Sequence, residues 1–338
     1  MSGAALESLC RGRSLDATES AELFTRIAKG DVAEVELAAL LVALRCKGES
    51  ADELAGAASA LLRAAPTFPP FEGEVADVCG TGGDGFRTLN VSTAVAFVVA
   101  AAGVRVVKHG GRAVTSASGS TDALLALGVQ PARSCEQASR DVADTGLAFI
   151  SAADVHVALR SVAAVRRQLG VRTTFNLLGP MLNPARPSIR LVGVPEPRFV
   201  RPVAEALQRL GTRVALVVHG SGTDEISLRG PTSCALLRDG SIEDRTIDPG
   251  ELGLGFHEVD ALRVESAAES AARIEACFDG CGRDADAAVI AANAGGLLWI
   301  AGKSSSLGDG VADALGVIRS GRARAMLDEH RARTGGAA

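Results

Sequence analysis

Residues 75–85, VADVCGTGGDG, and residues 88–93, TLNVST, decide the fold expected for this chain. The apolar start of the first stretch predicts a short buried strand, and the second stretch predicts the start of a helix. The glycines between them let the backbone adopt positive φ angles and approach a ligand closely. A strand, a glycine-rich loop and a helix N-terminus together predict a site that favours anions, above all phosphate.

This first loop is not a Walker motif, because no Gly-Lys-Ser/Thr follows its glycines. Nucleotide hydrolysis therefore becomes a weaker interpretation. Taken alone, a glycine-rich turn without any ligand explains the same residues equally well. A second loop of the same kind would favour a functional interpretation.

The second predicted strand, Val104–Val107, ends in such a loop. Residues 108–116, KHGGRAVTS, carry two cations and several hydroxyls, and Ser118-Gly119-Ser120 follow. Carboxyl ends of parallel strands meet at one edge of a sheet, so two such loops can bind a ligand with separated phosphates. Alone, Lys108 and Arg112 would more often be solvated surface charges, and His109 a hydrogen-bonded loop histidine. The pair of loops favours a functional interpretation.

A pair of adjacent acids follows a later apolar run. Residues 214–218 predict a strand, and a short Ser-Gly-Thr turn leads from it to Asp224 and Glu225. Magnesium prefers hard oxygen ligands and typically bridges one or two carboxylates to substrate phosphates. A solvated surface pair is the commoner explanation for two acids in a loop. Beside two phosphate-suited loops, however, the pair becomes a candidate magnesium site.

Strand-like and helix-like runs alternate from residue 75 onward, which predicts an α/β fold. Right-handed crossovers should then make the central sheet mostly parallel. The tail from about residue 266 is rich in helical patterns and is expected to cover the sheet. The expected strands are 75–79, 104–107, 147–150, 190–194 and 214–218, and the expected helices include 91–102, 155–169, 199–210 and 285–301.

The first 66 residues predict three or four short amphipathic helices. Gly30 is expected to end one of them, and Asp31–Glu34 and Ser50–Glu53 have the pattern of capping boxes at helix starts. The prolines of residues 66–70, PTFPP, cannot continue a helix and predict a linker. We therefore predict a small helical domain over residues 1–66, to which later helices can add, and a large α/β domain over residues 71–334.

The composition of the 338 residues limits the partners of the protein. A net charge of −5 argues against general binding to nucleic acid or to acidic membranes. The seven scattered cysteines do not suit a disulfide framework, so a reducing compartment is expected. The N-terminus lacks the apolar core of a signal peptide, and no apolar run approaches the roughly 20 residues that span a bilayer. We expect a soluble cytoplasmic protein.

Together these motifs resemble the anthranilate phosphoribosyltransferase family, whose fold is shared by nucleoside phosphorylases. The resemblance covers nearly the whole chain and includes the helical N-terminal part. It implies a helical domain hinged to an α/β domain, with the active site in the cleft, and a homodimer. The matching motifs are GTGGD at 80–84, NVST at 90–93, KHGxR at 108–112, RTTFNLLGPxxNP at 172–184, and Asp224-Glu225.

The resemblance implies the transfer of phosphoribose from phosphoribosyl pyrophosphate to anthranilate in tryptophan biosynthesis, with Mg²⁺ as cofactor. Ser92, Asp224 and Glu225 would bind the metal ions. Lys108, His109 and Arg166 would be catalytic. Apart from the resemblance, His109 and His156 are the two candidates to take the released proton. The acceptor would lie against Gly80, Gly111, His156 and Arg166, with one helix carrying His156 and Arg166. The donor would be bound by Gly80, Gly83, Asp84, Thr88, Asn90, Val91, Ser92, Thr93, Lys108, Gly110, Arg112, Ala113, Ser116 and Ser120.

Two departures fall on the acceptor side of the motifs. Gly111 stands where the family has asparagine, and residues 152–159, AADVHVAL, lack both prolines of the family segment. The donor half of the site therefore matches better than the acceptor half. Anthranilate is the expected acceptor, with another amino- or hydroxybenzoate of specialised metabolism as the alternative. A nucleoside phosphorylase and a non-catalytic nucleic-acid-binding relative are weaker alternatives.

Overall fold

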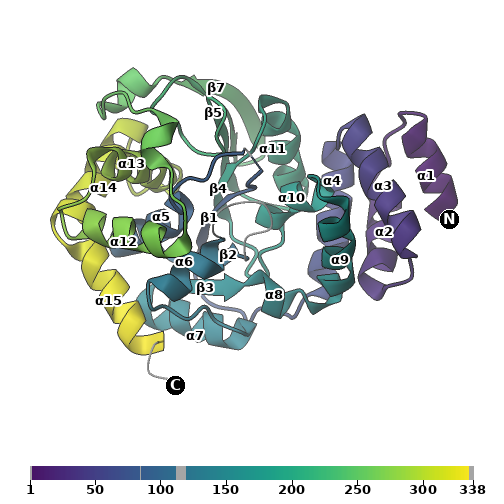
Figure 1. Cartoon of the computed structure of the whole chain (residues 1–338), viewed down its shortest axis with the longest axis horizontal. Helices are drawn as coiled ribbons and strands as arrows, with labels where there is room; N and C mark the ends of the chain where they lie inside the picture. The colour runs from purple at the N-terminus through teal and green to yellow at the C-terminus, as the bar shows by residue number, and fades with distance from the viewer. Residues whose placement is uncertain (1, 84, 112–118, 335–338) are drawn as a thin grey trace.

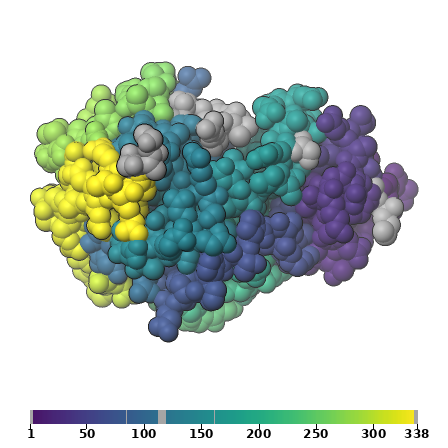
Figure 2. Space-filling model, turned by 90° about the horizontal axis from the view of Figure 1, so that it is seen from below, coloured from purple at the N-terminus to yellow at the C-terminus, as the bar shows by residue number. Residues whose placement is uncertain are grey.

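The computed structural model describes residues 2–83, 85–111 and 119–334. The candidate donor-binding residues Asp84, Arg112, Ala113 and Ser116 lie outside these ranges. A central sheet is covered by helices on both faces, and the helices of residues 2–64 form one end of the molecule (Figure 1). The space-filling view shows these N-terminal helices at one end of an elongated shape (Figure 2).

Within the described residues, the sheet has seven strands in the order β3-β2-β1-β4-β5-β6-β7. The first five strands are parallel, and all five predicted strands are confirmed. The chain runs outward from β1 through β2 and β3 and then returns to place β4 on the other side of β1. This reversal makes the carboxyl ends of β1 and β4 the place where α/β sheets bind ligands. The strands are β1 (Ala76–Gly80), β2 (Val106–Gly110), β3 (Leu147–Ser151), β4 (Ile189–Gly193), β5 (Val214–Gly220), β6 (Thr232–Arg238) and β7 (Ser241–Ile247).

Strands β6 and β7 form an antiparallel hairpin that the sequence analysis did not predict. Asp239 and Gly240 connect them, both at positive φ angles of 46° and 81°. An Asp-Gly pair at positive φ is typical of a tight hairpin turn. The signal was therefore present, but the polar sequence of the exposed edge strand β7 hid it.

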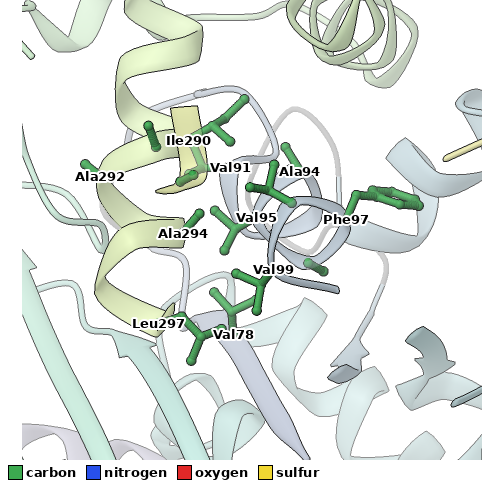
Figure 3. Close-up of a cluster of buried hydrophobic side chains, with 14 of the residues drawn as sticks. Val78, Val91, Ala94, Val95, Phe97, Val99, Ile290, Ala292, Ala294 and Leu297 are labelled. Atoms are coloured by element: carbon green, nitrogen blue, oxygen red, sulfur yellow. The ribbon is translucent and has the colours of Figure 1, made fainter. Parts of the chain in front are cut away.

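Helices α5 (Val91–Ala101) and α13 (Asp284–Ile300) pack together on one face of the sheet, with small and branched side chains between them (Figure 3). Helix α13 also lies very close to α14: a Cβ atom on Gly295 would come within 2.5 Å of the Val311 backbone nitrogen. The helix-rich tail is confirmed as the cover of this face. The other helices on this side are α6 (Ser120–Ala126), α12 (Ala267–Phe278), α14 (Leu307–Arg319) and α15 (Arg322–Thr334).

The opposite face of the sheet shares a core with the N-terminal helices. Helix α11 (Val200–Arg209) covers strands β5 to β7, and α4 packs against α11. Helix α7 (Cys135–Thr145) covers β2 and β3 on this side. The helices at the N-terminal end are α1 (Ser2–Cys10), α2 (Ala17–Lys29), α3 (Glu34–Lys47), α4 (Ala51–Ala64), α9 (Arg160–Leu169) and α10 (Thr174–Leu178).

The α/β fold class with its helical N-terminal part is thus confirmed, whereas the exact domain boundaries at residues 66 and 71 stay predictions. Among the described residues, no helix is both long and apolar enough to cross a bilayer. The irregular residues 65–75 connect α4 to β1 and line a pocket of about 550 Å³ on the side where the strands begin.

Two of the three predicted helix ends in the N-terminal part are confirmed. Gly30 ends α2 in the left-handed conformation, and Ser50 and Glu53 form a reciprocal capping box. The capping box predicted at Asp31–Glu34 is wrong, because α3 begins only at Glu34 and no side chain caps it. A further capping box, not predicted from the sequence, forms at Asp16–Glu19, where Asp16 accepts hydrogen bonds from two backbone N–H groups.

The predicted helix over residues 155–169 is wrong as a single element. The chain instead forms α8 (Ala152–Val155), a 3₁₀ turn at Val157–Leu159, and then α9. His156 lies between them at φ −109° and ψ 53°, outside helical geometry, and its buried ring Nε2 is 2.8 Å from the Leu182 carbonyl oxygen. His156 and Arg166 therefore do not share a helix.

Acid should destabilise the fold through His330, which α15 buries beside Phe97 and Phe149. Burial lowers the pKa of His330 to about 4, although a hydrogen bond with Leu147 raises it. In the unfolded chain this histidine has its usual pKa of about 6.5, so below pH 6.5 the unfolded chain binds more protons than the folded one. The stability that the neutral, buried His330 contributes is therefore fully present above pH 6.5 and is lost as the pH falls toward 4.

We expect urea unfolding to show a lower free energy of unfolding for the wild type at pH 5 than at pH 7. His330 should account for roughly 2 kcal/mol of that decrease. A His330→Leu variant should lose correspondingly less stability over the same range. Equal losses in the two proteins would contradict this assignment.

Candidate active site

Asp224 lies against the carboxyl ends of β1 and β4, where it meets the first glycine-rich loop. Its Oδ2 atom accepts a hydrogen bond of 2.7 Å from the Gly82 backbone nitrogen. A Cβ atom on Gly80 would lie 2.2 Å from that same Oδ2, and one on Gly193 would lie 1.6 Å from the Asp224 carbonyl oxygen. Gly80 and Gly193 pair in register, so both strands end in glycine where the acid needs the space.

The first loop has the backbone conformation that its glycines predicted. Gly82, Gly83 and Gly85 have φ angles of 64°, 84° and 82°, which other residues rarely adopt. Residues 86–90 lead from this loop to helix α5, which begins at Val91. A flexible glycine backbone and a helix N-terminus thus lie together, which is the arrangement expected for binding phosphate.

The first turn of α5 is held in place from α12. The Asn90 backbone nitrogen donates to Ser270 Oγ at 3.0 Å, and Ser270 Oγ donates to Asn90 Oδ1 at 2.8 Å. Ser92 is half-buried, Val91 is buried, and Thr93 is fully buried. Within the described chain, no hydrogen-bond partner meets the Thr93 hydroxyl.

Glu225 lines a small cavity beside the same helix, together with Thr88 and Val91. In the described part of the chain, no group of three or more His, Cys, Asp or Glu side chains could enclose a metal ion. The candidate ligands are two carboxylates and the Ser92 hydroxyl, all hard oxygen donors. That set fits Mg²⁺, which keeps positions for water and for substrate phosphates.

Lys108 is buried in β2, only 2% exposed, and its Nζ atom donates to the Val78 carbonyl oxygen of β1 at 2.8 Å. Asp77 lies buried nearby, and burial raises its pKa while the Lys108 charge opposes that rise. Asn183 donates to Asp77 Oδ2 at 2.9 Å and to the Val107 carbonyl oxygen at 2.7 Å. The Lys108 cation is therefore fixed in the interior of the sheet, between β1 and β2.

The second loop begins with two close contacts around Ser120. A Cβ atom on Gly110 would lie 2.1 Å from Ser120 Oγ, which donates to the Gly111 carbonyl oxygen at 3.3 Å. At Gly111 a Cβ atom would lie 3.8 Å from Ala152 Cβ, which is an ordinary van der Waals contact. Among the described residues, packing therefore does not require glycine at position 111.

His109 and His156 meet as an edge-to-face pair, with ring centroids 5.2 Å apart. Both rings are buried, and burial lowers the pKa of each; the neighbouring His156 lowers the pKa of His109 further. Burial therefore favours the neutral form of both imidazoles. Among the described residues, His109 Nε2 has no hydrogen-bond partner, and burial disfavours the charged form of this ring.

Arg166 projects from α9 as a half-buried cation. Its Nη2 atom donates to Asn176 Oδ1 at 3.2 Å, and its guanidinium lies 5.8 Å from the centre of the Phe175 ring. Burial lowers the pKa of Arg166, and within the described residues no carboxylate forms an ion pair with it. The contacts thus join Arg166 to Asn176 rather than to His156.

Sequence reasoning missed the residues that support the site from outside the loops. Glu49 and Asp77 make buried contacts, but nothing in their local sequence sets them apart from other polar residues. Asn176 and Asn183 belong to the motif at residues 172–184, which marked the segment without indicating a role for either. Such roles depend on contacts between distant segments.

Models of two parts of one family match the chain. The "Glycosyl transferase family, helical bundle domain" matches residues 4–65, and the "Glycosyl transferase family, a/b domain" matches residues 72–324. The curated anthranilate phosphoribosyltransferase of Sorangium cellulosum is 45% identical to this chain, over 97% of this chain and 94% of the relative. The one of Shewanella putrefaciens is 42% identical, over 96% of this chain and 94% of the relative.

Solved structures agree with these matches. Anthranilate phosphoribosyltransferase from Thermus thermophilus has a TM-score of 0.91 at 39% identity, covering 97% of this chain and 98% of the other. The Saccharomyces cerevisiae enzyme in complex with phosphoribosyl pyrophosphate and Mg has a TM-score of 0.88 at 26% identity, covering 100% and 98%. Motifs, fold and full-length similarity agree, and the chain belongs to the anthranilate phosphoribosyltransferase family.

Proposed function

We propose that this protein transfers the phosphoribosyl group of phosphoribosyl pyrophosphate to anthranilate, giving N-(5-phosphoribosyl)anthranilate and pyrophosphate for tryptophan biosynthesis. One observation supports this function above the others. The Asp224 carboxylate lies on the first glycine-rich loop although 142 residues separate it from Gly82. A carboxylate suited to bind Mg²⁺ thus lies next to a loop suited to bind phosphate, which is the combination that a pyrophosphate leaving group requires.

The donor half of the reaction would depend on the loop and the first turn of α5. Negative charge develops on pyrophosphate as its bond to ribose C1 breaks, and preorganised backbone N–H groups stabilise such charge. Ser92, Asp224 and Glu225 would hold Mg²⁺, which when bound supplies positive charge to the pyrophosphate oxygens. Lys108 adds a fixed positive charge beneath the strand ends.

The acceptor half would depend on Arg166 and the histidine pair. A half-buried guanidinium without an acidic partner among the described residues can pair with the carboxylate of an aromatic acid. The aromatic amine is already nucleophilic, so a weak base suffices. The neutral His109–His156 pair would take the proton released when the new C–N bond forms.

The direct test is to incubate the protein with phosphoribosyl pyrophosphate, Mg²⁺ and anthranilate while following anthranilate fluorescence and pyrophosphate release. We expect magnesium-dependent loss of both substrates. Pyrophosphate release only with another amino- or hydroxybenzoate would keep the mechanism and change the acceptor. Phosphate-dependent release of base from a nucleoside would instead indicate a phosphorylase, and no turnover of the donor with any acceptor would refute the proposal.

Replacing Arg166 should affect the acceptor and spare the donor. We expect Arg166→Ala to raise the KM for anthranilate by roughly tenfold or more, because a charge-assisted hydrogen bond contributes about 1.5–3 kcal/mol. Steady-state kinetics with each substrate varied in turn would measure this. Arg167→Ala is the matched control, since the neighbouring side chain is exposed. Equal effects of the two variants would count against the role of Arg166.

We further propose that the protein is a cytoplasmic homodimer that binds no nucleic acid. All seven cysteines are free thiols, as expected in a reducing compartment. Val35 and Val42 lie seven residues apart on α3, and their side chains are 85% and 39% exposed, so they offer an apolar strip for a second subunit. Light scattering would give the mass, and a labelled oligonucleotide would test nucleic-acid binding at low salt.

A further inference from the structure

Asn176 connects the candidate acceptor-binding arginine to a buried network at the helical end of the molecule. Its Oδ1 atom accepts two hydrogen bonds, at 3.2 Å from Arg166 Nη2 and at 3.0 Å from the Thr173 backbone nitrogen. The second bond fixes the side chain at the start of α10. The first bond fixes one end of the guanidinium.

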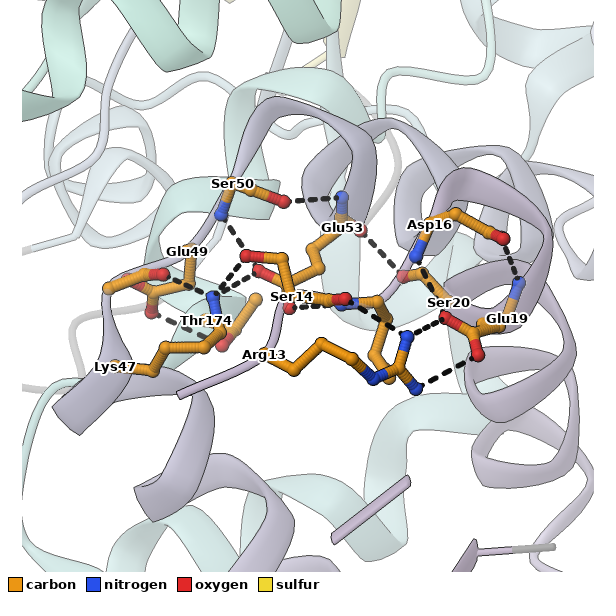
Figure 4. A network of polar contacts seen from close by, with 12 residues as sticks. Arg13, Ser14, Asp16, Glu19, Ser20, Lys47, Glu49, Ser50, Glu53 and Thr174 are labelled. Carbon is orange, nitrogen blue, oxygen red and sulfur yellow. Dashed lines mark hydrogen bonds and ion pairs between the residues drawn. The ribbon is translucent and has the colours of Figure 1, made fainter. Parts of the chain in front are cut away.

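The segment that carries Asn176 is itself anchored to the turn between α3 and α4. Arg172 Nη1 and Nη2 donate to the two carboxylate oxygens of Glu49 at 3.1 and 3.2 Å, and Thr174 Oγ1 donates to Glu49 Oε1 at 3.2 Å. The Glu49 side chain is fully buried. Figure 4 shows Glu49 reaching Thr174 within the wider polar network of Ser50 and Glu53.

We propose that Asn176 is a positioning residue that orients Arg166 for the acceptor carboxylate while leaving the arginine charge uncompensated. The inference rests on the proposed function and deepens it. Asn176 is neutral and contacts only one Nη atom, and the other described residues make no hydrogen bond to the guanidinium, so its remaining donors can meet a bidentate carboxylate. An acid in the same place would compete with the substrate for those donors.

The nearly isosteric Asn176→Asp substitution separates positioning from support of the fold. Aspartate keeps an oxygen that can accept the Thr173 N–H bond, so a purely structural role predicts normal folding and normal kinetics. Positioning predicts otherwise, because the new carboxylate pairs with Arg166. We expect the KM for anthranilate to rise about tenfold while kcat and the KM for phosphoribosyl pyrophosphate stay within about twofold.

Two further variants complete the experiment. Asn176→Ala removes the bond to Arg166 and should raise the KM for anthranilate by about two- to tenfold, as expected for one hydrogen bond. Gln168→Glu adds the same negative charge at an exposed position of α9 and should leave the kinetics of the wild type unchanged. Thermal midpoints of all proteins should agree within a few degrees.

The inference fails if Asn176→Asp has wild-type kinetics, if both KM values rise in parallel, or if its thermal midpoint falls with its activity. Failure of the proposed function looks different, because the wild type itself would then consume no anthranilate. In that case, the affinity of salicylate for the two proteins, measured by calorimetry, tests the inference on its own. Binding to Asn176→Asp that is about tenfold weaker than binding to the wild type supports it. Equal binding, or no binding to the wild type, overturns it.

Discussion

Replacing Asp224 by asparagine is expected to lower kcat by roughly a hundredfold to a thousandfold, the range seen when one preorganised electrostatic group is lost from a transition-state site. Asparagine keeps an oxygen that can accept the Gly82 N–H bond, so the loop should hold its shape. The lost group is the negative charge that would bind Mg²⁺. The concentration of Mg²⁺ needed for half-maximal activity should rise as well.

Steady-state rates measured over a range of Mg²⁺ concentrations would test this expectation. Asp239→Asn is the matched control, because it makes the same chemical change at the exposed β6–β7 turn, where asparagine tolerates the positive φ angle of 46°. We expect the control to keep the activity and the magnesium dependence of the wild type. Comparable losses in both variants, or an Asp224→Asn enzyme with normal magnesium dependence, would exclude Asp224 as a metal ligand.

Replacing Glu49 by alanine is expected to lower the free energy of unfolding by about 3–5 kcal/mol, the usual cost of removing one partner from a buried ion pair. The Arg172 side chain is only 10% exposed and would lose both carboxylate contacts. Thr174 would lose its acceptor too. The guanidinium would keep its position over the Phe199 ring, 4.8 Å away, which offsets part of the loss.

Urea unfolding of the wild type and of Glu49→Ala would measure the difference. Glu22→Ala serves as the control, since Glu22 is exposed on α2 and alanine favours helices. Its stability should lie within about 0.5 kcal/mol of the wild type. A loss below about 1 kcal/mol for Glu49→Ala would show that the pair contributes little net stability, as some buried pairs do.

The local patterns of the sequence predicted most elements because their signals lie within a few residues. The apolar runs gave all five parallel strands, and Gly30 and the Ser50–Glu53 box marked real helix ends. The same reasoning failed at residues 155–169, where His156 leaves helical geometry and its ring reaches Leu182, 26 residues away. A contact across that distance leaves no periodic signal in the sequence.

The sequence by itself determined the α/β alternation, the phosphate-suited loop of residues 80–85 and, through its motifs, the family. Only the tertiary structure decided which candidate residues meet: Asp224 with the first loop, His109 with His156, and Arg166 with Asn176. It also showed that Glu49 anchors Arg172 across 123 residues. The reason is physical, since periodicity and turn chemistry act between neighbours, whereas these contacts depend on strand order and helix packing set by the whole core.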